Sequence, residues 1–417
     1  MTAGPLHGGQ KPLLLRCGDE PEALIRRLET AWAQQRTVAL ADPAEQNLLQ
    51  AALEGAQLPP GAAVLVGSGG SSGGRRWCLQ PLAHLEASAA ATARWLEAEG
   101  IDPAAALLLN PLPLHHVSGL LPLVRARQWG AAQRILPPAL LRRPEELAAA
   151  CPLPPGRAGL LSLVPTQLAR LLDHPAAVAW LRRCAVIWVG GAALPPELAG
   201  RARRLELPLA PCYGATETAA MVCALPPRRF LAEDPPPAGC GFPLADVELR
   251  LEPGTGAVQL RTVRLSPGWL ERGRLQPLPR TAEGWWTSGD AGALTPEGLV
   301  IRGRLDGAIS SGGETVFPEQ LEERLRREAA ARGLPLAEVL LLGVEEPPWG
   351  QRLVALVRGH APDDWAQLEG ALPALTAGWR AAERPRRWLP CPELAPTAAG
   401  KWQRGRWQRW LASLQNA

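Results

Sequence analysis

Three short stretches of this chain combine glycine with hydroxyl, carboxylate or guanidinium groups, which is a combination that binds phosphate. The first, SGGSSGGRR (68–76), can present free backbone N–H groups and serine hydroxyls to an anion. It fails the Walker A pattern because Arg75 and Arg76 follow its last glycine, and it fails GxGxxG because Ser72 replaces the third glycine. A flexible solvent loop is the alternative interpretation of this stretch.

The second stretch, CYGATETAAM (212–221), contains the only tyrosine of the chain, Tyr213. Thr216 and Glu217 add a hydroxyl and a carboxylate beside a glycine turn. These groups suit a phosphate oxygen and a Mg²⁺ ion, because Mg²⁺ prefers oxygen ligands. A polar turn after a strand is the alternative.

The third stretch runs from WWTSGDAGAL (285–294) into IRGRLDGAISSGGETVFPEQLEERL (301–325). An aspartate after a glycine turn suits ribose hydroxyls, and Arg302 and Arg304 suit phosphate oxygens. SSGGE (310–314) is another loop that can hold an anion ahead of a helix. Each piece alone is also compatible with ordinary turn chemistry.

A lysine near the end of the chain stands out against the composition. Of the 44 basic residues only Lys11 and Lys401 are lysine, and all the others are arginine. An ammonium is a compact point charge on a flexible stem, whereas a guanidinium is broad and planar. A site that needs the first would keep a lysine, although a chance lysine on an exposed segment is the alternative.

The segments around these stretches alternate between helix and strand patterns. Amphipathic helices are predicted over 22–35 and 43–54, and strand, loop and strand over 62–80. The alternation continues through a helix at 81–100, a strand and helix at 159–172, and a buried strand, glycine turn and helix from 184. This pattern predicts an α/β fold with largely parallel strands.

Other segments indicate how the chain is divided into domains and whether it spans a membrane. Residues 103–124 have no formal charge but contain four prolines, which predicts strand, loop and helix and no membrane span. Short apolar strands over 239–305 predict a small β-rich subdomain, and another α/β segment follows at 315–417. A chain of 417 residues suggests two or more domains.

Composition narrows the function classes. The chain is 47% hydrophobic and 20% charged, which is typical of soluble globular proteins. A net charge of +4 without a long basic run does not favour nucleic acid. The eight scattered cysteines form no CxxC pair, so neither a zinc site nor a redox motif is indicated. Without a recognisable signal peptide, we expect reduced thiols and a cytoplasmic location.

In this order and spacing, the pieces resemble the acyl-adenylate-forming superfamily of acyl-CoA synthetases, adenylation domains and luciferases. The resemblance runs from about residue 60 to 410. Arg76 stands where the family has a lysine, and Arg75 where it has a proline. The matching motifs are the phosphate loop at Ser68 to Arg76, the adenine turn at Gly190, Gly191 and Ala192, YGxTE at Tyr213 to Glu217, TGD at Ser288 to Asp290, GRxDxxIxxGGExVxPxExE at Gly303 to Glu322, and PxTxxGKxxR at Pro396 to Arg404.

The resemblance implies a fold and a reaction. The fold is a large N-terminal α/β domain with parallel sheets and a β-rich subdomain (1–305), followed by a small mobile C-terminal α+β domain (306–417) with its hinge at Asp306. A carboxylate attacks the α-phosphate of Mg-ATP to give acyl-AMP and pyrophosphate. A thiol, such as that of coenzyme A, then attacks the mixed anhydride to give a thioester and AMP. Catalysis is then positioning and charge stabilisation.

The resemblance also implies residue roles. Asp290 would hold the ribose with help from Arg304, Thr216 would contact the α-phosphate and Glu217 would bind Mg²⁺. Lys401 would stabilise adenylation, and rotation of the small domain would exchange it for the SSGGE loop. The remaining nucleotide contacts would come from Ser68, Gly70, Ser71, Ser72, Gly73 and Arg76 around the phosphates, and from Gly190, Gly191, Ala192, Tyr213 and Gly214 around the adenine.

Two further stretches resemble the 2-succinylbenzoate–CoA ligases of menaquinone and phylloquinone biosynthesis, namely LPLHHVSGLLPLVRAR (112–127) and LSLVPTQLARLL (161–172). His116 would face the acid with Ser118 and Gly119 beside it, whereas His115 replaces the usual phenylalanine. Arg125 would pair with the second carboxylate of a dicarboxylic acid. A core histidine is the alternative for His116.

Other functions stay open at this stage. One is a CoA ligase for another aromatic or medium-chain acid, and another is an adenylation enzyme that loads a carrier protein. A nucleotide-binding protein without activity is a third, which the intact Thr216, Glu217, Asp290 and Lys401 oppose. Only about 65 residues precede the phosphate loop. This trimming fits the quinone-pathway subgroup but shortens its usual dimer surface, so a homo-oligomer is left open.

Overall fold

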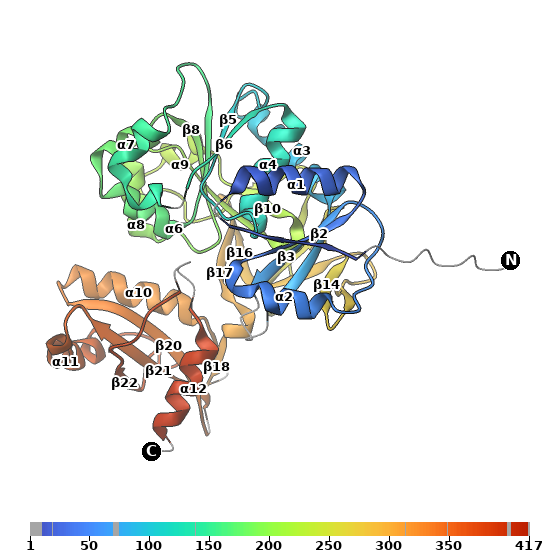
Figure 1. The fold of residues 1–417 in the computed structure, drawn as a ribbon. Coiled ribbons are helices and arrows are strands. Elements are labelled where there is room, and N and C mark those ends of the chain that lie inside the picture. Colours follow the sequence, from blue (N-terminus) through green and yellow to red (C-terminus); the bar gives the residue numbers. More distant parts are fainter. Residues whose placement is uncertain are drawn as a thin grey trace.

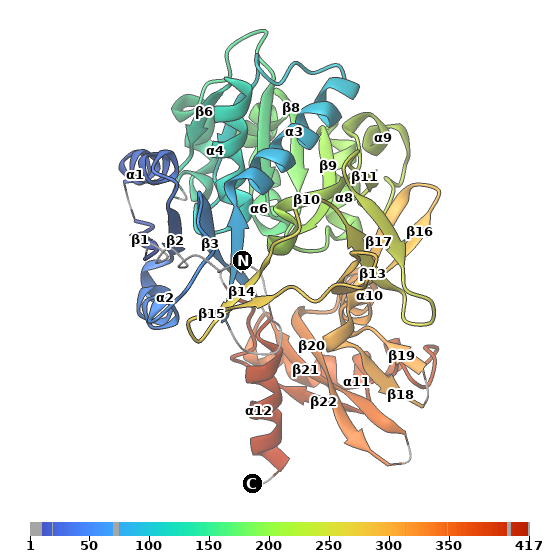
Figure 2. The ribbon, with the colours of Figure 1, turned by 90° about the vertical axis from the view of Figure 1, so that its right-hand side faces the viewer.

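The computed structural model describes residues 11–18, 20–69, 75–137, 139–312, 314–347, 349–397 and 402–415. Within these residues the strands form four sheets (Figures 1 and 2). Three sheets and the helices around them make up the part coloured blue to yellow in Figure 1, and the fourth lies in the orange to red part. The architecture is mixed α/β, as the alternating sequence pattern predicts.

The first sheet carries the segment that resembles a phosphate loop. Its order is β1-β2-β3-β4-β14-β15, where β1 to β3 are parallel and the remaining pairs are antiparallel. A short connection between β3 and β4 forces the antiparallel hairpin, so the expectation of parallel sheets holds for half of this sheet. Its elements are β1 (Leu13–Arg16), α1 (Pro21–Ala33), β2 (Thr37–Ala41), η1 (Pro43–Glu45), α2 (Gln46–Leu53), β3 (Ala63–Gly69), β4 (Arg75–Pro81), β14 (Gly268–Glu271) and β15 (Arg274–Pro277).

The second sheet has the order β11-β10-β9-β8-β7-β5-β6, in which the five strands β5 to β9 are parallel and the β9–β10 and β10–β11 pairs are antiparallel. The carboxyl ends of its parallel strands meet at one edge, which is where open α/β sheets bind ligands. Its strands are β5 (Leu107–Asn110), β6 (Ala132–Ile135), β7 (Gly159–Leu163), β8 (Cys184–Val189), β9 (Leu209–Ala215), β10 (Ala220–Ala224) and β11 (Phe242–Pro243).

Helices cover both faces of the second sheet. Several begin with a proline at the first helical position, where its missing N–H costs nothing and its fixed φ favours the helix. The expected strand, loop and helix of residues 103–124 are confirmed as β5, a loop and α4, and Pro122 lies inside α4 without ending it. The helices are α3 (Leu82–Ala98), α4 (Val117–Trp129), η2 (Leu140–Arg142), η3 (Pro144–Glu146), α5 (Leu147–Ala150), α6 (Pro165–Leu172), α7 (Pro175–Leu181), α8 (Pro196–Arg204) and α9 (Pro227–Ala232).

The core follows the alternation of side chains along each strand. On β8, Ile187 and Val189 pack in the cluster that includes α6 to α8, whereas Val186 and Trp188 pack in the cluster that includes α3. Burying each such side chain contributes about 1.5–3 kcal/mol relative to exposure. The second sheet thus packs apolar side chains on both of its faces.

The predicted β-rich subdomain is smaller than the segment 239–305. It is an antiparallel sheet of β12 (Glu248–Leu251), β13 (Ala257–Arg261), β16 (Trp286–Thr295) and β17 (Gly298–Arg304). Strands β14 and β15 of the same segment join the first sheet, and β11 joins the second. The segment therefore connects the three sheets instead of folding apart from them.

The fourth sheet has order β19-β18-β21-β20, with β22 paired to β21. Helices α10 and α11 share a core cluster with one face of this sheet, and α12 packs on the other face. The elements are η5 (Leu305–Gly307), β18 (Ile309–Ser311), β19 (Glu314–Val316), α10 (Pro318–Ala331), β20 (Leu336–Glu346), β21 (Gly350–Gly359), η6 (Pro362–Asp364), α11 (Trp365–Leu375), β22 (Arg387–Pro390) and α12 (Arg404–Gln415).

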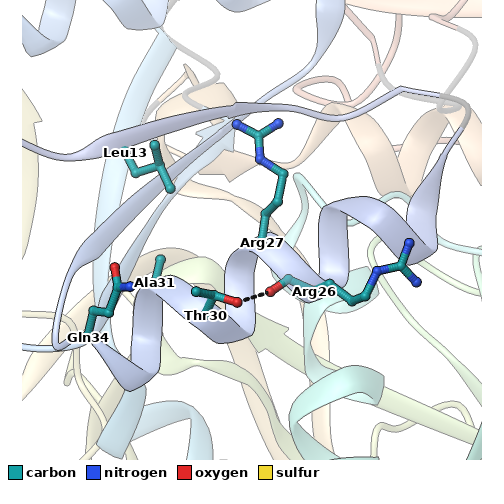
Figure 3. Close-up of a pocket in the computed structure, with 6 residues that line it drawn as sticks. All are labelled: Leu13, Arg26, Arg27, Thr30, Ala31 and Gln34. Atoms are coloured by element: carbon teal, nitrogen blue, oxygen red, sulfur yellow. Dashed lines mark hydrogen bonds between the residues drawn. The ribbon is translucent and has the colours of Figure 1, made fainter.

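Two surface observations complete the fold. A hollow of about 330 Å³ lies between β1 and α1 (Figure 3), lined by Leu13, Arg26, Arg27, Thr30, Ala31 and Gln34. None of the site residues expected from the sequence lines it, so it is separate from the site described below. Across the described ranges, no helix is both long and apolar enough to cross a bilayer.

Candidate active site

A chain of polar contacts joins the second sheet to the third. The Tyr213 hydroxyl on β9 donates to Asp290 Oδ2 on β16 at 2.6 Å, and Arg304 Nη1 on β17 donates to Asp290 Oδ1 at 3.2 Å. Burial, followed by the charge of Asp290, raises the pKa of Tyr213 well above its ordinary value. The phenol therefore stays a neutral donor, and both oxygens of Asp290 are oriented.

Arg304 extends this chain to the residue expected at the hinge. Its Nε and Nη2 donate to the two oxygens of Asp306 at 3.2 Å each. Burial lowers the pKa of Arg304, but the Asp306 and Asp290 carboxylates outweigh burial and leave that pKa raised. One guanidinium thus bridges the aspartate expected at the ribose and the aspartate expected at the hinge.

The TET turn (Thr216–Thr218) after β9 is held through its backbone. Gln80 Nε2 on β4 donates to the Thr216 carbonyl at 2.6 Å, and the backbone N–H of Ser266 donates to the Glu217 carbonyl at 2.7 Å. Ala219 and Ala220, directly after the turn, have φ of 52° and 71°. These are strained angles for residues other than glycine, and such strain persists where surrounding contacts enforce it.

The carboxylate of Glu217 has one partner on the first sheet. Trp269 Nε1 on β14 donates to Glu217 Oε1 at 2.8 Å. The Arg76 guanidinium lies 5.0 Å from the centre of the Trp269 ring, and Arg76 Nε lies 3.5 Å from Glu271 Oε1. Arg76, expected to bind the phosphates, therefore contacts two residues of β14, and one of them, Trp269, is the hydrogen-bond donor to Glu217.

Glycines in the site are required by close backbone approach. A Cβ at Gly190 would lie 2.8 Å from Cys212 Sγ, and a Cβ at Gly214 would collide with the Ala220 carbonyl. Gly191 has a φ of +80°, and Gly191 and Ala192 are exposed past the end of β8. The expected adenine turn and YGxTE turn thus follow neighbouring parallel strands and meet at the same sheet edge.

The expected phosphate loop is described only at its ends. Ser68 is buried on β3, opposite Arg76 on β4. Gly70, Ser71, Ser72 and Gly73 lie outside the described residues. The TET turn contacts β3 and β4, the two strands that this loop connects, and Gln80 of β4 donates to it.

The residues expected to bind the acid lie around the start of α4. His116 is half-buried immediately before this helix, and its ring centre lies 4.4 Å from that of His115. His115 is buried with Nε2 3.5 Å from Asp42 Oδ2, a polar pairing that phenylalanine would not make. Ser118 is exposed, whereas a Cβ at Gly119 would collide with the Pro113 carbonyl, so Gly119 lets the helix approach that loop.

Arg125 is buried in α4 at 4% exposure. Its Nη2 donates to Thr92 Oγ1 at 3.2 Å and its guanidinium lies 4.9 Å from the Trp188 ring centre. Among the described residues no carboxylate pairs with it, and the buried donors Arg125 Nε and Trp188 Nε1 lack acceptors. Burial lowers the pKa of Arg125 to about 10, so it remains a cation at neutral pH.

Lys401 lies outside the described residues, but the residue that anchors the following helix is described. Arg404 Nη2 donates to both oxygens of the buried Glu322, at 2.9 and 3.1 Å, and Nη1 donates to the Leu341 carbonyl at 2.8 Å. Both partners come from the expected family motifs, GRxDxx…ExE and GKxxR. Because Arg404 is the first residue of α12, this ion pair fixes the start of the helix that follows Lys401 in the sequence.

The chemistry of the site is that of oxygen ligands and cations, without a reactive thiol. Burial raises the pKa of Cys212 and Cys240 to about 12, so both thiols stay protonated at neutral pH. Glu217 supplies the carboxylate expected for Mg²⁺, and its Oε2 accepts no hydrogen bond from another described residue. No group of three or more metal-ligating side chains occurs in the described ranges. Mg²⁺ is commonly held by one or two protein carboxylates together with phosphate and water oxygens, and Glu217 offers one such carboxylate.

Sequence reasoning missed the residues that support the site from a distance. Trp269 and Gln80 hold the Thr216–Glu217 turn, and Arg264 donates to the Thr218 and Met221 carbonyls. None of these lies in a short motif. The paired strand pattern around β14 was visible, but its membership of the first sheet was not.

Comparison with known proteins agrees with the arrangement. The profile of the family described as AMP-binding enzyme matches residues 63–260. A 2-succinylbenzoate–CoA ligase from Salmonella typhimurium is 31% identical over 303 residues, covering 73% of this chain and 60% of that protein. A Mycobacterium tuberculosis protein described as a probable 2-succinylbenzoate–CoA ligase is 30% identical over 338 residues, covering 78% of this chain and 80% of that protein.

The fold is also shared with a solved structure. The o-succinylbenzoate CoA synthetase from Bacillus subtilis, in complex with its acyl-adenylate intermediate, superposes with a TM-score of 0.75 at 20% identity. That superposition covers 97% of this chain and 89% of the other. The chain spans about 60% of the length of several of the curated relatives that it matches.

Proposed function

The chain belongs to the AMP-binding enzyme family, and from that premise we propose that it is an ATP-dependent acid–CoA ligase that acts on 2-succinylbenzoate. The acid would form an acyl-AMP with release of pyrophosphate, and coenzyme A would then take the acyl group with release of AMP. The observation that carries the proposal is the contact chain from Tyr213 through Asp290 and Arg304 to Asp306. It joins residues from three family motifs at one place.

The nucleotide would be held at the carboxyl edge of β8 and β9. The Tyr213 ring would stack on adenine beside the Gly190–Ala192 turn, and Asp290 would accept hydrogen bonds from the ribose hydroxyls. Tyr213 and Arg304 already orient that carboxylate, which has lone pairs left for the ribose. Holding the α-phosphate in line with the attacking carboxylate is the main contribution to rate that such a site makes.

Charge stabilisation would come from the Thr216–Glu217 turn and from Lys401. Thr216 would donate to the α-phosphate, and Lys401 would neutralise the charge that grows as the acid carboxylate attacks. Glu217, whose Oε2 accepts no hydrogen bond within the described part of the chain, would hold Mg²⁺, which when bound neutralises phosphate charge and polarises the phosphoryl oxygens. Arg76, which is 45% exposed, would serve the departing pyrophosphate.

The choice of acid rests on Arg125 and on the relatives named above. A buried guanidinium without a carboxylate partner is costly, and a bound anion would remove that cost. The distal carboxylate of 2-succinylbenzoate is an anion of the required kind, and His116 and Ser118 would lie along its path. The relatives from Salmonella and Mycobacterium carry the name of this ligase and support the same choice. Its product would feed menaquinone or phylloquinone biosynthesis.

The proposal includes a domain division and a location. We place the boundary at 305/306, where Asp306 would be the hinge, so that the C-terminal domain brings Lys401 to the first half-reaction and the SSGGE loop to the second. All eight cysteines are free thiols, which is consistent with a reducing compartment such as the cytoplasm.

The proposal is tested by measuring pyrophosphate release from Mg-ATP with 2-succinylbenzoate, benzoates and fatty acids, with and without coenzyme A. We expect turnover to favour 2-succinylbenzoate, with AMP and a CoA thioester as products. Arg125→Met should raise the KM for this dicarboxylate by about 30-fold and leave the KM for benzoate unchanged, because it removes a buried charge partner. Arg127→Met, an exposed arginine of the same helix, is the control.

Each other outcome has a distinct meaning. Turnover of a different acid would keep the reaction and discard the substrate. An unchanged KM in Arg125→Met would remove Arg125 from the acid site. Acyl-AMP formation without a CoA thioester would favour a carrier-protein acceptor, and ATP binding without pyrophosphate release would favour a binding protein.

A further inference from the structure

One face of the ladder between β4 and β14 points at the Thr216–Glu217 turn. In this antiparallel pair Trp269 lies opposite Cys78 and Leu270 lies opposite Trp77. Residues opposite each other share a face, and neighbours along a strand alternate. Trp77, Leu79 and Leu270 are therefore on the face that packs in an apolar cluster. Cys78, Gln80 and Trp269 are on the other face.

Donors of this second face reach two consecutive residues of the turn. Gln80 Nε2 donates to the Thr216 carbonyl at 2.6 Å, and Trp269 Nε1 donates to Glu217 Oε1 at 2.8 Å. The Ser266 N–H, just before β14, donates to the Glu217 carbonyl at 2.7 Å. The ladder therefore fixes both the backbone of Glu217 and its side chain.

The indole is itself held in place. Trp269 is half-buried, and the guanidinium of Arg76 lies 5.0 Å from its ring centre. Arg76 in turn lies 3.5 Å from Glu271, two residues along β14. An indole N–H is a donor only, so it can hold a carboxylate oxygen but cannot take its place as a ligand of a cation.

We propose that Trp269 is a positioning residue for Glu217: its N–H fixes Oε1, and this presents Oε2 to the cation that accompanies the nucleotide. The inference rests on the proposed function, in which Glu217 binds Mg²⁺. It adds a residue 52 positions away, on another sheet, that acts on the metal through the carboxylate alone.

The fourth sheet region contains a similar arrangement that serves as a matched control. Trp379 Nε1 donates to Glu328 Oε2 at 3.3 Å, and the guanidinium of Arg324 lies 4.3 Å from the Trp379 ring centre. Both tryptophans thus combine an indole–carboxylate hydrogen bond with an arginine on the ring. Only Trp269 has a carboxylate partner in the candidate active site.

The test is direct binding of Mn²⁺, as a paramagnetic substitute for Mg²⁺, to the full-length protein with a non-hydrolysable ATP analogue, followed by electron paramagnetic resonance. Trp269→Phe keeps a ring under Arg76 and removes the N–H. We expect its Mn²⁺ dissociation constant to rise about tenfold, since hydrogen bonds to charged groups are among the stronger ones. Trp379→Phe should bind like the wild type, and analogue binding without metal should be the same in all three proteins.

A double-mutant cycle with Glu217→Gln separates positioning from a general structural effect. Once the carboxylate is gone, Trp269→Phe should cause no further loss of Mn²⁺ affinity. Trp269→His, which keeps a ring N–H, should bind Mn²⁺ more tightly than Trp269→Phe and keeps the test available if the phenylalanine variant folds poorly.

Three results would overturn the proposal: unchanged Mn²⁺ affinity in Trp269→Phe, an equal loss in the Glu217→Gln background, or no nucleotide-dependent Mn²⁺ binding by the wild type. A protein that binds Mn²⁺ with nucleotide yet releases no pyrophosphate with any acid would count against the proposed ligase only. The metal measurement would then still decide the role of Trp269, because it needs no acid.

Discussion

The hydroxyl of Tyr213 donates to Asp290 Oδ2 at 2.6 Å, across 77 positions of the chain and between two sheets. Burial and the nearby carboxylate raise the pKa of this phenol. The bond orients the carboxylate that the ribose would reach and sets the plane of the ring that the adenine would reach. One hydrogen bond would thus couple the two halves of the proposed nucleoside site.

Alkaline titration of Tyr213 tests this coupling. Tyr213 is the only tyrosine, so the near-ultraviolet tyrosinate absorbance reports one site. The folded pKa lies above the unfolded value of about 10. We therefore expect no tyrosinate in the folded protein at that pH, and unfolding and ionisation together above it. The same sign means that the contribution of this group to stability is present below about pH 10 and is lost as pH rises further.

Asp290→Asn provides the contrast for this titration. It removes the charge that opposes ionisation of the phenol, so tyrosinate should form at lower pH than in the wild type, although burial still raises the pKa. Ordinary titration of Tyr213 in the folded wild-type protein would contradict the hydrogen bond to Asp290.

Arg264 offers a second prediction, on stability. It is fully buried, with Nε 2.7 Å from Asp246 Oδ2 and Nη1 donating to Ser88 Oγ and to the Met221 carbonyl. Arg264→Met would leave Asp246 without its cation and remove the hydrogen bonds to Ser88 Oγ and the Met221 carbonyl. We expect it to lower the free energy of unfolding by about 3–5 kcal/mol, the cost of breaking a buried pair.

Arg264→Lys separates geometry from charge in this network. A single ammonium cannot make the forked contacts of a guanidinium, so lysine should recover only a small part of the loss. Arg274→Met, at an exposed position of β15, should stay within about 0.5 kcal/mol of the wild type. Denaturant unfolding measures all three, and a loss in Arg264→Met no larger than in Arg274→Met would refute a structural role.

The sequence allowed the elements and motifs to be predicted, because these depend on local patterns. Strand and helix periods placed β3, β4, α3, β7 and β8, and the family resemblance placed the YGxTE turn. The partners of these elements depend on long-range pairing that no local pattern encodes. Strand β14 (268–271) pairs with β4 (75–81), which is far from it in the sequence, and this pairing places Trp269 beside Glu217.

The last prediction concerns the ion pair of Glu322 and Arg404, whose contribution to the free energy of unfolding should depend on pH. Burial raises the pKa of Glu322 to about 6, so the pair is ionised at neutral pH. Because the folded pKa exceeds the unfolded value, the folded state binds more protons between these pKa values. The contribution of Glu322 to stability is therefore largest below its unfolded pKa and falls as pH rises through about 6.

Arg404→Met would remove the nearer cation and leave the buried carboxylate with Arg326 alone, whose Nη2 lies 4.0 Å from Oε2. The loss should cost about 3 kcal/mol where Glu322 is ionised. The variant should raise the pKa of Glu322 further, so more of the loss is recovered by protonation. We expect the deficit in unfolding free energy to be smaller at about pH 5 than at about pH 8. Arg409→Met, an exposed position of α12, should show no such dependence. An Arg404→Met deficit that is equal at both pH values would mean that lost packing, and not the loss of the Arg404 charge beside Glu322, destabilises the start of α12.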